Sequence, residues 1–102
     1  MFRHRDHNYF VYITTNPSKT VLYTGVTNDL NIRIQQHREN KGIASKGFAA
    51  KYYCYKLIYF ERYPDINIAI EREKEIKLMK RETKMELIKT TNPLMNLINV
   101  YE

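Results

Sequence analysis

Four side chains that can move protons or neutralise anionic charge stand close together in the N-terminal part of the sequence. They are two tyrosines, an arginine and a histidine: Tyr12, Tyr23, Arg33 and His37. The arginine and the histidine are four residues apart, which places them one turn apart on one face of a helix. Leu30 and Ile34 predict that this face is buried, and burying a charge without a partner is costly. The pattern therefore indicates that this part of the helix borders a cleft.

A carboxylate later in the chain has a similarly unusual position. Residues 65–80 predict a helix capped by Asp65. Its apolar stripe consists of Ile66, Ala69, Ile70, Ile76 and Met79. Glu73 lies in the middle of this stripe, whereas Arg72 is expected to point into solvent. An inward carboxylate is usually paired, bound to a metal or catalytic. The alternative is a Glu73–Arg33 salt bridge that only stabilises the fold.

A β-hairpin is expected to carry the two tyrosines. Residues 9–13 and 20–24 are rich in β-branched and aromatic side chains, which favour strands. A turn centred on residues 17–18 would join them. This turn predicts that Tyr12 directly faces Tyr23, with the two Cβ atoms about 5 Å apart.

A basic loop is expected at residues 38–51, which contain two glycines. Lys41, Lys46 and Lys51 recur along it with little acidic charge. The segment is either a solvated linker or a loop that grips a phosphate backbone. Its position in the sequence, directly after the helix that borders the cleft, favours phosphate binding.

The next residues complete the predicted fold. Residues 52–61 form an aromatic-rich run that predicts a third strand covered on both faces. Its rings could stack on bases, but a small domain needs them in its core, and we favour the core. A short basic helix is predicted at residues 81–89. The order β-β-α-β-α-α indicates an α+β fold with a small three-stranded, mainly antiparallel sheet flanked by helices.

Length and composition narrow the class of protein. At 102 residues, one domain is expected at 9–102, after a basic N-terminal arm at 1–8. The net charge of +6 and the pI near 9.5 suggest a polyanionic partner, with nucleic acid first and an anionic membrane surface second. One cysteine allows no internal disulfide, so a reducing cytoplasm is expected. No apolar run reaches the roughly 20 residues of a membrane span.

The two tyrosine motifs resemble those of a known family. Phe10-Val11-Tyr12 and Tyr23-Thr24-Gly25, with Arg33 and His37 at the family's spacing, resemble the GIY-YIG nuclease superfamily. The likeness is closest to its small stand-alone single-domain bacterial branch, and it extends through Glu73. The sequence is also similar to the UvrC N-terminal endonuclease domain, which belongs to the same superfamily. Phe10 stands where the name motif has glycine, and Val26 stands where the UvrC branch tends to have lysine.

The resemblance implies a role for each residue of the site. Glu73 would be the metal ligand, for Mg²⁺ or Mn²⁺ held with few protein ligands. Arg33 would neutralise charge developing on the phosphate. Either Tyr23 or His37 would take the proton from water, and spacing does not decide between them. Tyr12 would position Tyr23 or the water.

The implied function is a metal-dependent endonuclease that hydrolyses phosphodiester bonds in DNA, with RNA left open. We expect selectivity for structure with low sequence specificity, and a task in DNA repair or recombination. The chain is expected to be a monomer or a weak homodimer, with a partner protein as one source of specificity. One alternative is a catalytically silent nucleic-acid-binding module on the same scaffold. Another is a structural role in which the charge serves solubility.

Overall fold

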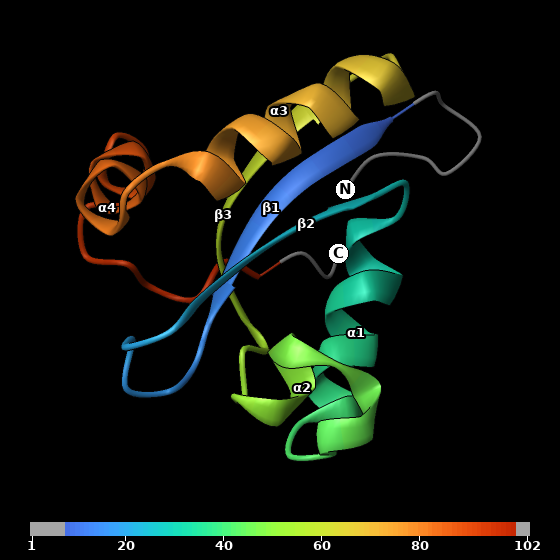
Figure 1. Cartoon of the computed structure of the whole chain (residues 1–102), viewed down its shortest axis with the longest axis vertical. Helices are drawn as coiled ribbons and strands as arrows, with labels where there is room; N and C mark the ends of the chain where they lie inside the picture. Colours follow the sequence, from blue (N-terminus) through green and yellow to red (C-terminus); the bar gives the residue numbers. More distant parts are fainter. Residues whose placement is uncertain (1–7, 100–102) are drawn as a thin grey trace.

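Three antiparallel strands form the sheet at the centre of the molecule, in the order β2-β1-β3 (Figure 1). The computed structural model describes residues 8–99. The strands are β1 (Tyr9–Thr15), β2 (Leu22–Thr27) and β3 (Lys56–Tyr63). Their β-branched and aromatic side chains favour extended backbone. The predicted α+β fold with a small antiparallel sheet is confirmed.

Helices lie on both faces of this sheet. They are α1 (Leu30–Asn40), the short η1 (Ala44–Lys46) and α2 (Phe48–Lys51), then α3 (Ile66–Leu78) and α4 (Arg81–Lys89). The Asp29 carboxylate caps α1 by accepting a hydrogen bond from the Ile32 N–H at 3.0 Å. Asp65 caps α3 in the same way through the Asn67 N–H. Both long helices therefore begin where local side chains satisfy their free N–H groups.

The alternation of side chains along β1 creates two apolar clusters. Val11 and Ile13 face α3 and α4, where they pack with Ala69, Ile76 and Ile88. Phe10 and Tyr12 point to the opposite face and pack with Leu30 and Ile34 of α1. Because successive strand residues point to opposite faces, Tyr12 is committed to the α1 side of the sheet.

The hairpin register differs from the prediction. Tyr12 pairs with Gly25, and Tyr23 pairs with Thr14, so the strands are displaced by two residues from the expected alignment. The connection is longer than a tight turn because the Asn16 side chain accepts hydrogen bonds from the Thr20 and Val21 N–H groups at 2.8 and 3.0 Å. A displacement of two leaves every side chain on its predicted face, since the period of a strand is two.

The third strand begins later than predicted. The expected strand at 52–61 starts only at Lys56, because α2 and a turn occupy the residues before it. Tyr53 has a φ of 59°, which is incompatible with a strand. Tyr52 and Tyr53 are 41% and 50% exposed, so the expectation that they belong to the core is wrong. Tyr59, within the strand, is buried as expected.

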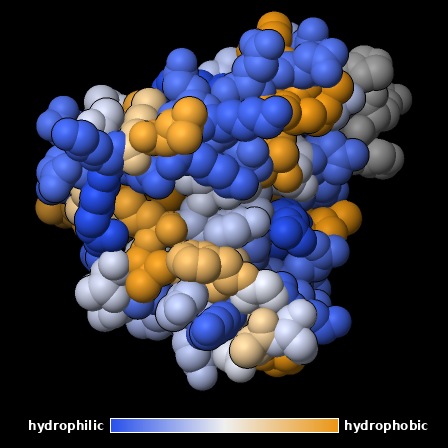
Figure 2. Space-filling model, viewed as in Figure 1, coloured by the Kyte–Doolittle hydropathy of each residue, from blue (hydrophilic) through white to orange (hydrophobic). Residues whose placement is uncertain are grey.

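The surface view shows how polar and apolar side chains are distributed. On the face seen in Figure 2, hydrophilic side chains cover most of the surface, and apolar side chains gather in the middle, between α4 and α2. Within residues 8–99, no helix is long and apolar enough to cross a membrane. Residues 1–7 of the predicted basic arm lie outside the described residues.

Candidate active site

The Tyr12 ring lies directly over Gly25 of the neighbouring strand. Tyr12 is completely buried, at 0% exposure. A Cβ atom on residue 25 would stand 2.5 Å from the Tyr12 hydroxyl oxygen and 2.6 Å from Cζ. Real Cβ atoms do not approach so closely, so only glycine fits at this position. The glycine at the end of the second motif thus makes room for the tyrosine of the first.

The Tyr12 hydroxyl joins two side chains of α1. Arg33 donates its Nε–H to this oxygen at 3.2 Å, and His37 Nε2 lies 2.8 Å away. Because the arginine can only donate, the single hydroxyl proton is free to be donated to the Nε2 of a neutral His37. Burial and the Arg33 charge lower the pKa of His37 to about 4, which keeps the imidazole neutral at pH 7.

The same surroundings keep Tyr12 protonated. Burial raises the pKa of Tyr12 to about 12, although Arg33 acts in the opposite direction. The Glu73 charge also acts to raise this pKa, and less than burial does. A buried phenol with so high a pKa is suited to holding its neighbours in place and not to removing a proton.

Tyr23 lies at the border between this buried group and solvent. Its ring centroid is 5.4 Å from that of His37 and 6.3 Å from that of Tyr12, and the residue is half-buried. Tyr23, Arg33 and His37 line a pocket of about 70 Å³ together with Asn40 and residues 46–50. The cleft predicted from the sequence is therefore present, and the predicted residues Tyr23, Arg33 and His37 reach it.

The predicted basic loop contributes one lysine to this pocket. Lys46 lines the pocket. The Lys41 and Lys51 ammonium groups lie over the Tyr55 and Tyr52 rings, at 5.0 and 5.3 Å from the ring centroids. All three lysines are exposed. The structure thus brings Lys46 to the other site residues and places the remaining two lysines outside the pocket.

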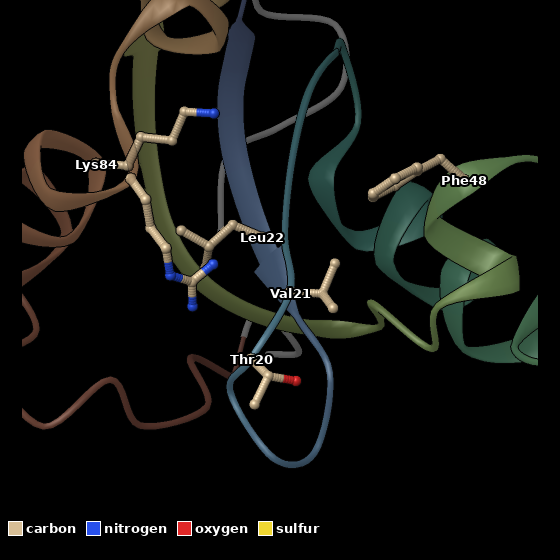
Figure 3. Close-up of a pocket in the computed structure, with 6 residues that line it drawn as sticks. Thr20, Val21, Leu22, Phe48 and Lys84 are labelled. Carbon is tan, nitrogen blue, oxygen red and sulfur yellow. The ribbon is translucent and has the colours of Figure 1, made fainter.

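Phe48 is a residue of the site that sequence reasoning missed. Its ring stacks on that of Tyr23, with centroids 6.4 Å apart and planes 23° apart. It lines the small pocket and also a second cavity of about 260 Å³, which Figure 3 shows between Phe48 and α4. The available signal was a single aromatic residue in a basic, glycine-containing loop.

Glu73 lies on α3, which packs against β1 and β2. Its side chain is 15% exposed and pairs with Lys77 at 3.5 Å. Arg33 instead donates to Tyr12 and to Gln36, the second at 3.0 Å. The alternative Glu73–Arg33 salt bridge is thus not present in the described part of the chain.

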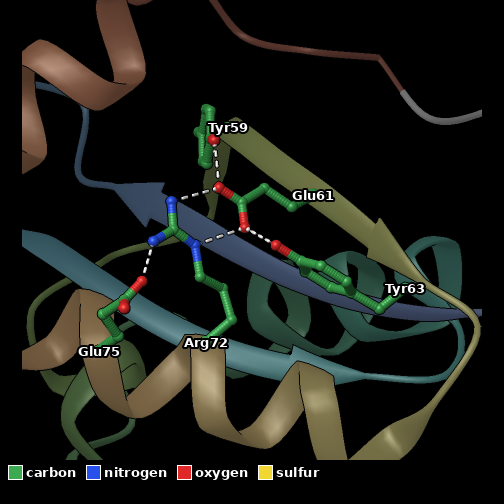
Figure 4. A network of polar contacts seen from close by, with 5 residues as sticks. All are labelled: Tyr59, Glu61, Tyr63, Arg72 and Glu75. Atoms are coloured by element: carbon green, nitrogen blue, oxygen red, sulfur yellow. Dashed lines mark hydrogen bonds and ion pairs between the residues drawn. The ribbon is translucent and has the colours of Figure 1, made fainter.

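A polar network fixes the orientation of α3 (Figure 4). Arg72 donates from Nε and NH2 to the two Glu61 carboxylate oxygens at 2.8 and 2.9 Å. The Tyr59 and Tyr63 hydroxyls donate to the same carboxylate at 2.5 and 2.6 Å, and Arg72 also pairs with Glu75. The expectation that Arg72 points into solvent is wrong, because Glu61 on β3 offers it a bidentate partner. This network ties α3 to β3 at the residue directly before Glu73.

The donor groups limit which metal could bind. Among residues 8–99, no three His, Cys, Asp or Glu side chains cluster in a way that could hold an ion. A zinc site needs three or four such ligands. A single partly exposed carboxylate suits a hard ion that keeps most of its waters, such as Mg²⁺ or Mn²⁺.

Comparisons with known proteins agree with this geometry. The sequence model of the family described as the GIY-YIG catalytic domain matches residues 8–95. The UPF0213 protein of Staphylococcus aureus strain Mu3 is 37% identical over 86 residues, which cover 80% of this chain and 95% of that protein. The UPF0213 protein of strain Mu50 gives the same values.

A solved structure supports the same assignment. The solution NMR structure of a UPF0213 protein from Bacillus halodurans superposes with a TM-score of 0.52 at 26% identity, over 85% of this chain and 88% of that one. This small protein shares the arrangement of strands and helices described above. The family match covers most of the chain, including the hairpin, α1 and α3. The chain therefore belongs to the GIY-YIG family, a nuclease family, and is related to its small UPF0213 members.

Proposed function

We propose that this protein is a divalent-metal-dependent endonuclease that hydrolyses phosphodiester bonds in DNA. The observation that carries the proposal is the pocket in which Tyr23, Arg33 and His37 meet above the buried Tyr12 hydroxyl. Nucleases of the family generally act on DNA and use a divalent metal. Low sequence specificity, selectivity for DNA structure and a task in repair or recombination are parts of the same proposal.

Arg33 is proposed to bind the phosphate at the cleaved bond. Burial acts to lower the pKa of its guanidinium, but the Tyr12 and Tyr23 oxygens raise the pKa above its usual value, so the group stays charged. Its Nε–H is already bound to Tyr12, which holds the planar group in one orientation. A preoriented charged donor stabilises developing negative charge more effectively than a mobile one.

Tyr23 is proposed to contact the attacking water. It is half-buried and lines the pocket, whereas the Tyr12 hydroxyl is fully buried beneath it. His37 is neutral and therefore able to accept a proton, but with a pKa of about 4 it is a weak base. We assign Tyr23 to orienting the water, and Tyr12 and His37 to positioning Tyr23 and Arg33.

Glu73 is the residue that would hold the metal. When bound, Mg²⁺ or Mn²⁺ would supply positive charge for the phosphoryl and leaving oxygens. Glu73 contacts the half-exposed Lys77 at 3.5 Å, and this contact is weak enough to be exchanged for an ion. The Arg72–Glu61 network on the adjacent residue keeps this stretch of α3 in place without using Glu73.

A nicking assay tests the proposal. Wild type, Glu73→Gln and Arg33→Ala would be incubated with labelled single-stranded, duplex, flap and junction DNA in Mg²⁺ or Mn²⁺. We expect cleavage by wild type and losses of at least about a hundredfold in both variants, with their thermal unfolding unchanged. Glu71→Gln is the matched control, because Glu71 is exposed on the same helix. This variant should cleave DNA like wild type.

Other results would contradict the proposal or favour an alternative function. Cleavage that survives in both site variants would contradict the proposed roles. Salt-sensitive DNA binding without product in any metal would indicate a catalytically silent binding module. Since a single site cuts one strand, we infer that the chain nicks DNA as a monomer or weak dimer. We place this activity in the cytoplasm. A partner protein would be the source of any further specificity.

A further inference from the structure

Phe48 is an exposed aromatic ring that separates two cavities. The residue is 52% exposed although it is large and apolar. Its ring stacks on that of Tyr23 and contacts that of Tyr52, with the Phe48 and Tyr52 centroids 4.7 Å apart. Tyr23 lines the small pocket, whereas Phe48 and Tyr52 are both exposed. Burial of the core does not explain this ring cluster, since about half of Phe48 remains exposed to water.

The larger cavity combines apolar side chains with positive charge. Its lining consists of Thr20, Val21, Leu22 and Phe48, with Arg81 and Lys84 of α4. In Figure 3, Leu22 points toward Lys84 and Val21 points toward Phe48. The volume of the cavity is about 260 Å³, and none of the described residues that line it is acidic. Apolar side chains are visible on this part of the surface in Figure 2, beside hydrophilic side chains of α4. The cavity therefore suits a ligand with a flat apolar part and an attached anion.

We propose that this cavity is a subsite for an unpaired nucleotide of single-stranded DNA. The base would lie against the Phe48 ring, and a phosphate next to it would pair with Arg81 and Lys84. Aromatic rings beside a positively charged groove are the usual means of binding single strands without sequence preference. The proposal rests on the proposed nuclease function for its identification of DNA, but it concerns binding outside the residues that would cleave.

The geometry favours an unpaired base for a physical reason. Bases in a duplex are stacked on both faces by their neighbours, so they cannot lie against a protein ring unless they leave the helix. A duplex alone would use Arg81 and Lys84 but would leave the exposed part of the Phe48 ring in contact with water. Because Phe48 also lines the small pocket, a strand bound here would continue directly to Tyr23 and Arg33. The preferred substrates would therefore have a single-stranded segment beside the cleaved bond.

Binding measurements without turnover test this subsite. Fluorescence anisotropy in EDTA would compare an oligothymidylate with a blunt duplex of equal length. Phe48→Leu keeps an apolar side chain but removes the ring, and Tyr53→Leu removes an equally exposed ring that lines neither cavity. We expect Phe48→Leu to weaken single-strand binding about 5- to 100-fold and duplex binding by less than about twofold. Tyr53→Leu should bind both DNAs like wild type.

A second pair of variants tests the positive charge of the cavity. Lys84→Ala should weaken single-strand binding. It should also lower the number of ions released on binding by about one, which the salt dependence of binding measures. Lys89→Ala removes the same charge from the same helix outside the cavity and should have a smaller effect.

The subsite is overturned if Phe48→Leu binds single strands like wild type, if it weakens single-strand and duplex binding equally, or if the two lysine variants are indistinguishable. Absence of cleavage by wild type would contradict the nuclease function but not the subsite, because the binding measurements do not depend on turnover.

Discussion

Tyr12 and Gly25 are partners across β1 and β2, and the tyrosine ring occupies the space above the glycine. This relationship explains why the two motifs of the hairpin belong together. The ring can lie flat against the sheet only where its neighbour has no side chain. In that position its hydroxyl reaches Arg33 and His37 on α1. The glycine thus supports the site without contacting a substrate.

Gly25→Ala is expected to destabilise the protein by about 1–3 kcal/mol, because the new methyl group would overlap the Tyr12 ring. Urea unfolding would measure the cost. The same substitution in a Tyr12→Ala background should cost clearly less, since the ring is gone. Equal costs in the two backgrounds would show that the ring is not the reason for the glycine.

Tyr12→Phe should cost about 1–3 kcal/mol of stability, because the buried His37 Nε2 loses its partner. DNA cleavage should fall as well, since Arg33 is no longer held. Urea unfolding and the ¹⁵N chemical shift of His37 Nε2 provide the measurements. Tyr53→Phe, at an exposed tyrosine, should change neither. An unchanged ¹⁵N shift in Tyr12→Phe would refute the hydrogen bond.

Stability should rise between pH 4 and pH 6.5 because of His37. Its pKa is lowered from 6.5 to about 4 by burial and by Arg33, so in this window the unfolded chain binds a proton that the folded chain excludes. The residue therefore contributes a positive slope of at most about 1.4 kcal/mol per pH unit. Urea unfolding across this range should show a shallower dependence for His37→Gln. A slope identical to that of wild type would mean that His37 is not buried in neutral form.

Glu61→Gln is expected to cost about 1.5–3 kcal/mol, since it removes the charged acceptor of Arg72 and of two tyrosine hydroxyls. Glu75→Gln, at a carboxylate that is 62% exposed, should cost about 0.5 kcal/mol or less. Thermal or urea unfolding would measure both. Because the network orients the turn of α3 that carries Glu73, only Glu61→Gln should also reduce cleavage. Equal effects of the two substitutions would argue against an anchoring role.

The elements themselves were predictable because their causes are local. Asp29 and Asp65 cap helices through bonds to residues three and two positions later, so both helix starts depend on local side chains. The face of each tyrosine was also predictable, since a strand alternates with a period of two whatever its exact partner. The inward position of Glu73 followed from the spacing of the apolar residues around it.

Other features depended on contacts between distant segments. The hairpin register was set by the Asn16 side chain holding the backbone of the loop, which lengthened the connection beyond a tight turn. Arg72 was turned from solvent by Glu61, a residue on another element. The stacking of Phe48 on Tyr23 requires the loop after α1 to fold back over the sheet.

The sequence by itself determined the three strands and the three longer helices, the faces of the residues along the hairpin, and which family the motifs resemble. These properties follow from periodicity and capping, which operate within a few residues. Only the tertiary structure decided that Tyr12 is buried beneath the pocket while Tyr23 lines it, and that Lys46, not Lys41 or Lys51, reaches it. The depth at which a side chain is buried depends on everything packed around it, and a local sequence pattern does not specify that depth.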